Sequence, residues 1–293
     1  MASAATLEPL APSSSPLESL PAELRDRILW NMPDLPTLHS IVRASPVMHA
    51  QYRSNRDKLL RACLERGLDG FLVHAHACQM SRLDHLGENR AHEVTIGFLE
   101  GYREWLPSGS NPCANLGSVN ASDCRWMAAF HLTVIRPLTR LYSRWAFAKF
   151  RVAAAVASAE KKDFKTAAEI MATVAAVHED TSAYDLSRSE EIRIMRALYQ
   201  TETYHHLIGY PQMTEADLFL EYQSIDMFFS FFDPWEAEAL GCIDVFFTEE
   251  FGPLFGKLSV KLRRAYAGRG PGYPIQSTRR NSALKAHGKV LPR

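Results

Sequence analysis

The chain has 293 residues, of which 46% are hydrophobic and 23% are charged, and its 33 Lys and Arg residues balance 33 Asp and Glu residues. This composition indicates a globular chain with enough residues for one large or two small domains, which excludes a low-complexity, disordered protein. No run of eighteen apolar residues occurs, so we expect no membrane span.

The cysteines are odd in number, widely scattered and free of any C-x-x-C spacing, and this pattern indicates a reducing compartment, cytoplasmic and/or nuclear. They are Cys63, Cys78, Cys113, Cys124 and Cys242. Residues 1–16 carry neither a basic start nor a continuous apolar stretch, so they predict a disordered tail and not a signal peptide.

Residues 17–52 predict three short helices. Pro21 suits the first turn of the first helix, where its missing N–H costs nothing, with Ser19 or Leu20 as the cap. Pro33 is expected to end this helix, because a proline disfavours helical geometry in the residue before it. Apolar residues recur along one side of the helix at positions Leu20, Leu24, Ile28 and Met32, with Leu29 beside them.

Two further start signals follow. Asp34 and Pro36 mark the second helix, and Ser45 with Pro46 predicts a capped third helix that has proline at its first position. Burying one large apolar side chain is worth roughly 1.5–3 kcal/mol, and few residues lie near enough in sequence to cover these helices. The segment therefore predicts either a partner or a neighbouring subdomain; the alternative is a helical hairpin folded onto the chain's own core.

The order of residues in this segment resembles the F-box. The resemblance is carried by Leu20-Pro21-x-Glu23-Leu24-x3-Ile28-Leu29-x2-Met32-x2-Leu35-x2-Leu38. Ala44-Ser45-Pro46, followed by Tyr52 and Ser54-Asn55-Arg56, is similar to the form found in fungal F-box-like proteins. The chain departs from many F-boxes in having no tryptophan near the end of the third helix.

The resemblance implies a non-enzymatic substrate receptor of a cullin ubiquitin ligase, with no catalytic residue, metal or cofactor of its own. The first three helices would dock on the Skp-type adaptor, and the rest of the chain would hold a target protein whose identity the sequence does not give. The adaptor-binding residues would be Leu20, Pro21, Leu24, Ile28, Leu29, Leu35, Leu38 and Val42.

The remainder of the chain predicts further helices, and strand signals are sparse. Helices are expected from a Ser54 cap to Leu64, over 71–83 and 91–105, from a Ser122 cap, over 135–159 with Pro137 in the first turn, and over 164–178. Residues 108–120 carry Pro, Gly and Asn and predict a loop. Three capping signals open the last helices, at Ser187-x-x-Glu190, Thr214-x-x-Asp217 and Asp233-Pro234-x-Glu236.

The predicted fold is all-α, with an N-terminal three-helix F-box followed by an irregular multi-helix body. The expected segments are a disordered tail (1–16), the F-box-like domain (17–54), the helical body (55–264) and a basic flexible tail (265–293). Parts of the body, over 186–199 and 232–243, resemble large fungal F-box-like families more weakly, which implies a shared helical body and no particular substrate.

Three clusters could carry chemistry, and each has a commoner structural interpretation. His74-x-His76-x-Cys78 could suggest zinc, but on a helix only the first and third side chains share a face, so two partly exposed histidines are expected instead. His205-His206 could serve a hydrolase if folding brought a nucleophile close. The aromatic residues could line a pocket, although a core role is commoner; they are Phe228, Phe229, Phe231, Phe232 and Trp235.

Charge is unevenly placed along the sequence. From Lys257 onward there are ten Lys or Arg residues and no Asp or Glu, which leaves 23 basic against 33 acidic residues before it. A basic tail could bind an acidic surface or nucleic acid, or fold back on the acidic body; nucleic-acid binding is not the expected role.

Two other functions remain open beside the substrate receptor. One is an adaptor-independent helical scaffold or regulator, in which the F-box-like helices complete the chain's own core. The other is a helical hydrolase that uses the neighbourhood of His205 and His206.

Overall fold

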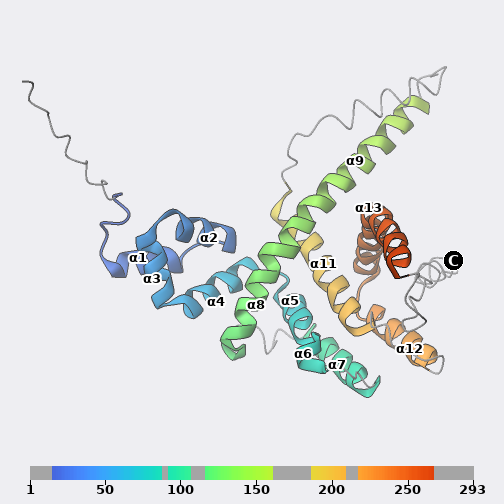
Figure 1. The fold of residues 1–293 in the computed structure, drawn as a ribbon, viewed down its shortest axis with the longest axis horizontal. Coiled ribbons are helices and arrows are strands. Elements are labelled where there is room, and N and C mark those ends of the chain that lie inside the picture. Colours follow the sequence, from blue (N-terminus) through green and yellow to red (C-terminus); the bar gives the residue numbers. More distant parts are fainter. Residues whose placement is uncertain (1–14, 88–91, 107–115, 161–185, 209–216, 267–293) are drawn as a thin grey trace, which may run out of the picture. The chain divides into compact units, whose positions relative to one another are not determined.

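The computed structural model describes residues 15–87, 92–106, 116–160, 186–208 and 217–266. All secondary structure in these ranges is helical, which confirms the all-α prediction (Figure 1). No helix of the described part is long and apolar enough to cross a membrane. The chain divides into two compact units, residues 1–137 and 138–293, so the division falls inside the predicted helical body.

Several predictions from sequence lie outside the described residues. These are most of the N-terminal tail, most of the 108–120 loop, the helix over 164–178, the Thr214 cap and nearly all of the basic tail.

The first unit is organised around one central helix. Its elements are α1 (Ala22–Trp30), α2 (Leu35–Ala44), α3 (Pro46–Ser54), α4 (Arg56–Gly67), α5 (Leu72–Met80), α6 (Leu83–Leu86), α7 (His92–Trp105), a 3-10 turn (Leu116–Ser118) and α8 (Ala121–Phe130). Helix α4 contacts α1, α2 and α3 and also packs on α8, which in turn contacts α5. In Figure 1 the blue helices α1–α3 form a group from which α4 leads toward α8.

The burial of α4 follows from this double contact. Five of its residues are buried: Leu59, Leu60, Ala62, Cys63 and Leu64. Polar side chains of the same helix bind the turn before α8, since Arg61 donates to the carbonyl of Val119 at 2.8 Å and Glu65 accepts from the amide of Leu116 at 2.7 Å. Helix α4 therefore joins α1, α2 and α3 to the rest of the unit.

Three of the predicted helix starts are confirmed. The Asp34 side chain accepts from the amide of Thr37 at 2.8 Å, and the Ser45 hydroxyl accepts from the amide of Met48 at 3.2 Å. Ser187 and Glu190 form a reciprocal capping box, in which each backbone amide donates to the other side chain. These side chains satisfy amide donors that the first turn of a helix leaves without partners.

Three other predicted caps are wrong, each by one or two residues. Pro21, not Ser19 or Leu20, is the cap of α1. Asn55 precedes α4, while Ser54 ends α3 and donates to the carbonyl of Ala50.

The third wrong cap is that of α8. Asn120 caps this helix by accepting from the amide of Asp123 at 2.8 Å, and the expected cap Ser122 lies inside the first turn. Asn120 caps the helix in place of Ser122 because its backbone is extended, and from there its side-chain oxygen reaches the amide of Asp123.

Pro137 lies in a continuous helix and not at a free helix start. Helix α8 passes through a π-helical segment, His131–Ile135, directly into α9 (Arg136–Glu160). Because proline has no N–H and its ring crowds the preceding turn, a wider π turn just before it accommodates the ring without ending the helix.

The second unit contains the rest of α9 with α11 (Arg188–Ile208), α12 (Asp217–Phe229) and α13 (Pro234–Tyr266). Helix α11 packs on α12 and α13. Phe228 and Phe232 are buried, with ring centroids 5.1 Å apart, so the core role expected of this cluster holds for them. Trp235 is 67% exposed and lies outside the core. It is in the first turn of α13, past the end of α12.

Two glycines of the first unit provide a matched test of this backbone. A methyl group added to Gly87 or Gly97 would have nothing within 4 Å, but only Gly87 has a positive φ, +82°. Gly97 lies inside α7, so Gly97→Ala is expected to stabilise the protein by about 0.5–1 kcal/mol. Gly87→Ala is expected to destabilise it by about 1–3 kcal/mol, because that backbone region is essentially reserved for glycine. Urea unfolding followed by circular dichroism measures both, and a destabilised Gly97→Ala would contradict the described course of α7.

Candidate adaptor-docking surface

Helix α1 carries apolar side chains in two directions. Leu29 is fully buried, whereas Leu24, five residues earlier, is 44% exposed. At about 100° per residue the two side chains lie about 140° apart around the helix axis, and Ile28 lies about 40° from Leu24. One side of α1 therefore packs into the unit, and Leu24 and Ile28 lie on another side. These two residues, together with Leu20 and Pro21 directly before the helix, are here named the α1 outer face.

The residues predicted to bind an adaptor divide between these environments. Leu29, Leu35 and Leu38 are buried, with exposed fractions of 0%, 3% and 3%. Leu20, Ile28 and Val42 are half-buried, while Pro21 and Leu24 are exposed. The three buried leucines belong to the core that α1 and α2 share with α4, so they support the outer face from inside and do not themselves reach a partner.

Trp30 is a residue that the periodicity missed. It is 45% exposed, yet it lies about 120° around the helix from Leu24. An apolar residue out of phase with the stripe is the only signal in the sequence that could have singled it out.

Hydrogen bonds from distant parts of the sequence fix the start of α1. The Ser45 hydroxyl donates to Glu18 at 2.5 Å while it accepts from the amide of Met48, so residue 18 is bound to the α2–α3 junction. The Arg25 guanidinium donates to the carbonyls of Glu18 and Leu20, at 3.0 Å and 2.8 Å. These contacts hold Leu20 and Pro21 beside the exposed Leu24.

The other end of α1 is fixed by helices α3 and α4. The Asp26 carboxylate accepts from Gln51 at 3.3 Å and from Asn55 at 3.0 Å. The Arg66 guanidinium donates to the carbonyls of Trp30 and Met32, at 2.5 Å and 2.9 Å, and so satisfies acceptors that the end of a helix leaves without partners. The outer face is thus presented by a helix tied down at both ends.

Burial also sets the chemistry of the thiol beneath these helices. Desolvation raises the pKa of Cys63 to about 11; Arg66 opposes the rise and Asp34 adds to it. The thiol stays protonated at neutral pH, which is the state of a core residue and not of a nucleophile.

The His74, His76 and Cys78 side chains serve the packing of α5. His74 and Cys78 are buried on one face, and His74 Nδ1 lies 2.7 Å from the hydroxyl of Tyr102. The expectation of two partly exposed histidines is therefore wrong for His74, because α7 covers it. Within the described residues, no group of three or more His, Cys, Asp or Glu side chains could hold a metal ion.

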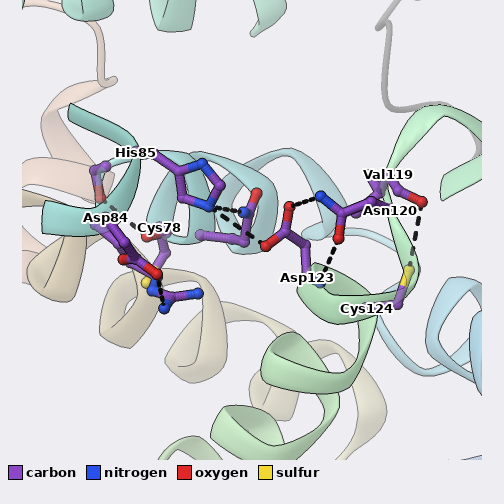
Figure 2. Close-up of polar contacts among 10 residues, drawn as sticks. Cys78, Asp84, His85, Val119, Asn120, Asp123 and Cys124 are labelled. Carbon is purple, nitrogen blue, oxygen red and sulfur yellow. Dashed lines mark hydrogen bonds and ion pairs between the residues drawn. The ribbon is translucent and has the colours of Figure 1, made fainter. Parts of the chain in front are cut away.

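A polar network joins the short helix α6 to its neighbours (Figure 2). His85 Nε2 lies 2.7 Å from Nε2 of Gln79 and 3.4 Å from Oδ1 of Asp123. Asp123 is buried, and its Oδ2 accepts from Asn120 at 2.6 Å. The imidazole and carboxylate bridge α5, α6 and α8, which is a structural role.

The histidine pair of α11 has a local explanation. His206 Nε2 lies 3.3 Å from Oε1 of Glu202, one helical turn away, and this hydrogen bond lowers the pKa of the Glu202 carboxyl. His205 is exposed and lies against the ring of Tyr204. A carboxylate can orient an imidazole, but a hydrolase also requires a nucleophile within its reach.

Comparison of the chain with family models, with curated proteins and with solved structures gave no match. The F-box interpretation of the α1 outer face therefore rests on the residue order and on the geometry described above.

The two apolar directions of α1 give a stability test. Leu29→Ala is expected to lower the free energy of unfolding by about 2–5 kcal/mol, because it leaves a cavity in a packed core. Leu24→Ala is expected to change it by no more than about 0.5 kcal/mol, as is usual for a surface site. Chemical unfolding of the two variants measures the difference, and equal losses would mean that Leu24 is covered in solution.

The half-buried His76 of α5 gives a pH test. Burial lowers the pKa of His76 from 6.5 to about 4; Asp123 opposes this shift and His85 adds to it. Between these values the unfolded chain binds the proton and the folded protein does not, so stability falls as pH falls from 6.5 toward 4, by up to about 1.4 kcal/mol per pH unit. His76→Gln should flatten this part of the profile, and parallel profiles for variant and wild type would refute the shift.

Proposed function

We propose that this chain is a non-enzymatic substrate receptor that docks on the Skp-type adaptor of a cullin ubiquitin ligase through the α1 outer face. The observation that carries the proposal is that α1 has apolar side chains on two sides, one buried in the unit and one exposed. Leu29 is fully buried, while Leu24 is 44% exposed on a helix fixed at both ends. The F-box resemblance puts Leu20-Pro21, Leu24 and Ile28 at the positions that would meet the adaptor.

The physical case for docking is the burial that the exposed apolar side chains of α1 would gain in a complex. Burying a large apolar side chain stabilises a complex by roughly 1.5–3 kcal/mol, and a few central residues usually dominate such an interface. Because Glu18, Arg25, Asp26 and Arg66 already hold α1 in place, docking would cost little ordering of the helix. The rest of the helical body would hold the target protein near the ubiquitin-transfer machinery, so its contribution would be positioning and not chemistry.

Co-purification with the adaptor tests the proposal. Leu24→Glu should reduce adaptor recovery by tenfold or more, because a carboxylate would be buried without a partner in the complex. The double variant Leu20→Ala/Pro21→Ala should likewise lose the adaptor.

Leu83→Glu is the matched control. Leu83 is an exposed leucine of the same unit, with an exposed fraction of 40% against 44% for Leu24, but it lies on α6. The proposal expects Leu83→Glu to retain the adaptor at the wild-type level. Equal recovery with Leu24→Glu and Leu83→Glu, or no adaptor recovery with the wild type, would refute it.

A second candidate is the adaptor-independent scaffold. It is favoured by the burial of Leu29, Leu35 and Leu38 and by the contacts of α4 with all three F-box-like helices, which together give these helices a core within the chain. Hydrogen exchange distinguishes the candidates: a receptor gains protection across α1 when adaptor is added, whereas a scaffold shows the same protection with and without it.

A further inference from the structure

The second half of α13 exposes large apolar side chains. Leu254, Phe255 and Leu258 are 58%, 68% and 51% exposed. Every residue from Gly252 to Lys261 is exposed except Ser259, which is half-buried. Single exposed leucines are common on protein surfaces and need no explanation. Three large apolar side chains exposed close together on one helix are unusual.

The first half of the same helix is packed. Phe246 is buried against Tyr142 and Trp145 of α9, and Glu249 accepts from Trp145 at 3.1 Å and pairs with Lys149 at 2.6 Å. The hydrogen bond from Lys149, and then that from Trp145, lower the pKa of Glu249. Among the described residues, the last aromatic contacts along α13 are those of Phe251 with Phe246 and Phe247. Beyond Pro253 the helix continues with its side chains open.

The exposed part carries its three largest apolar side chains on one side and is basic. Leu254, Leu258 and Phe255 fall within an arc of about 100° around the axis, and Lys261 and Lys257 border that arc on one side. The sequence has no Asp or Glu after Glu250 and ten Lys or Arg from Lys257 onward. A helix with Phe and Leu on one face and lysines beside it fits the interface of an anionic membrane, where the apolar residues enter the acyl boundary and the lysines meet the headgroups.

We propose that the second half of α13, defined by Leu254, Phe255, Leu258, Lys257 and Lys261, binds the surface of anionic lipid membranes. Charge complementarity decides between occupants. A second copy would bring lysines toward lysines, and nucleic acid would satisfy the lysines but leave Leu254, Phe255 and Leu258 in water. An anionic bilayer accommodates both groups at once. The proposal is independent of adaptor docking, which uses α1 of the other unit.

Vesicle sedimentation with the full chain tests this surface. Wild-type protein should sediment with vesicles of phosphatidylcholine and phosphatidylserine at low salt and not with pure phosphatidylcholine vesicles. Lys257→Gln/Lys261→Gln should weaken binding by about thirtyfold, since each lysine near an anionic surface contributes about 1 kcal/mol. Phe255→Ser/Leu258→Ser should weaken it by at least tenfold, because it removes the apolar contribution.

Trp235→Ser is the matched control. Trp235 is 67% exposed, against 68% for Phe255, and lies at the opposite end of the same helix; its substitution should leave sedimentation unchanged. The proposal is overturned if the wild type ignores anionic vesicles or binds neutral ones equally. It is also overturned if the lysine variant alone loses binding, or if the chain retains single-stranded RNA and not vesicles. Unchanged circular dichroism of each variant shows that a loss of binding is not a loss of folding.

Discussion

The packing of α4 against two sets of neighbours is the constraint on which the first unit depends. Five buried residues line this one helix, and it contacts α1, α2 and α3 as well as α8. Each fully buried leucine contributes roughly 1.5–3 kcal/mol relative to exposure, so Leu59 and Leu64 alone outweigh any single hydrogen bond at the same junction. Because α4 packs against α1, α2 and α3 and contributes to their shared core, their remaining apolar residues do not have to turn inward. The α1 outer face is a consequence of that arrangement.

The local parts of this fold could be predicted from the sequence, because their causes are local. Asp34 and Ser45 each precede a proline that suits the first helical turn, and both cap the helix that follows. At α4 the predicted cap failed because Asn55, which precedes the helix, makes no side-chain capping hydrogen bond and donates to Asp26 instead. At α8 it failed because Asn120 and Ser122 compete within two positions. Which one captures the orphan amide depends on the backbone angles that the tertiary structure imposes, and a one-dimensional pattern does not contain them.

The candidate site shows the same boundary between local and distant causes. Four-residue spacing identified Leu20, Leu24 and Ile28 as one stripe, but it could not tell which apolar residues α4 would cover. Leu29 is adjacent to Ile28 in sequence and is buried in the unit, where α3 and α4, both later in the chain, pack against α1. Arg66 and Asn55 reach back to α1 over similar separations. Such contacts are recognisable only once the fold brings them together, and they decide which residues are free to meet a partner.

The two proposed surfaces differ in the charges around them, and this difference sets how each would respond to salt. The α1 outer face is bordered by charges of both signs, Glu23 and Arg27, so its attraction for a partner would come mainly from apolar burial. The exposed half of α13 carries Lys257 and Lys261 with no acidic residue after them, so long-range attraction would contribute much of its binding. Screening at physiological salt acts beyond about 8 Å and therefore weakens the second kind of surface far more than the first. A rise in ionic strength would release α13 from a membrane while leaving a complex at α1 intact. Salt would therefore distinguish the binding at the two surfaces without any substitution.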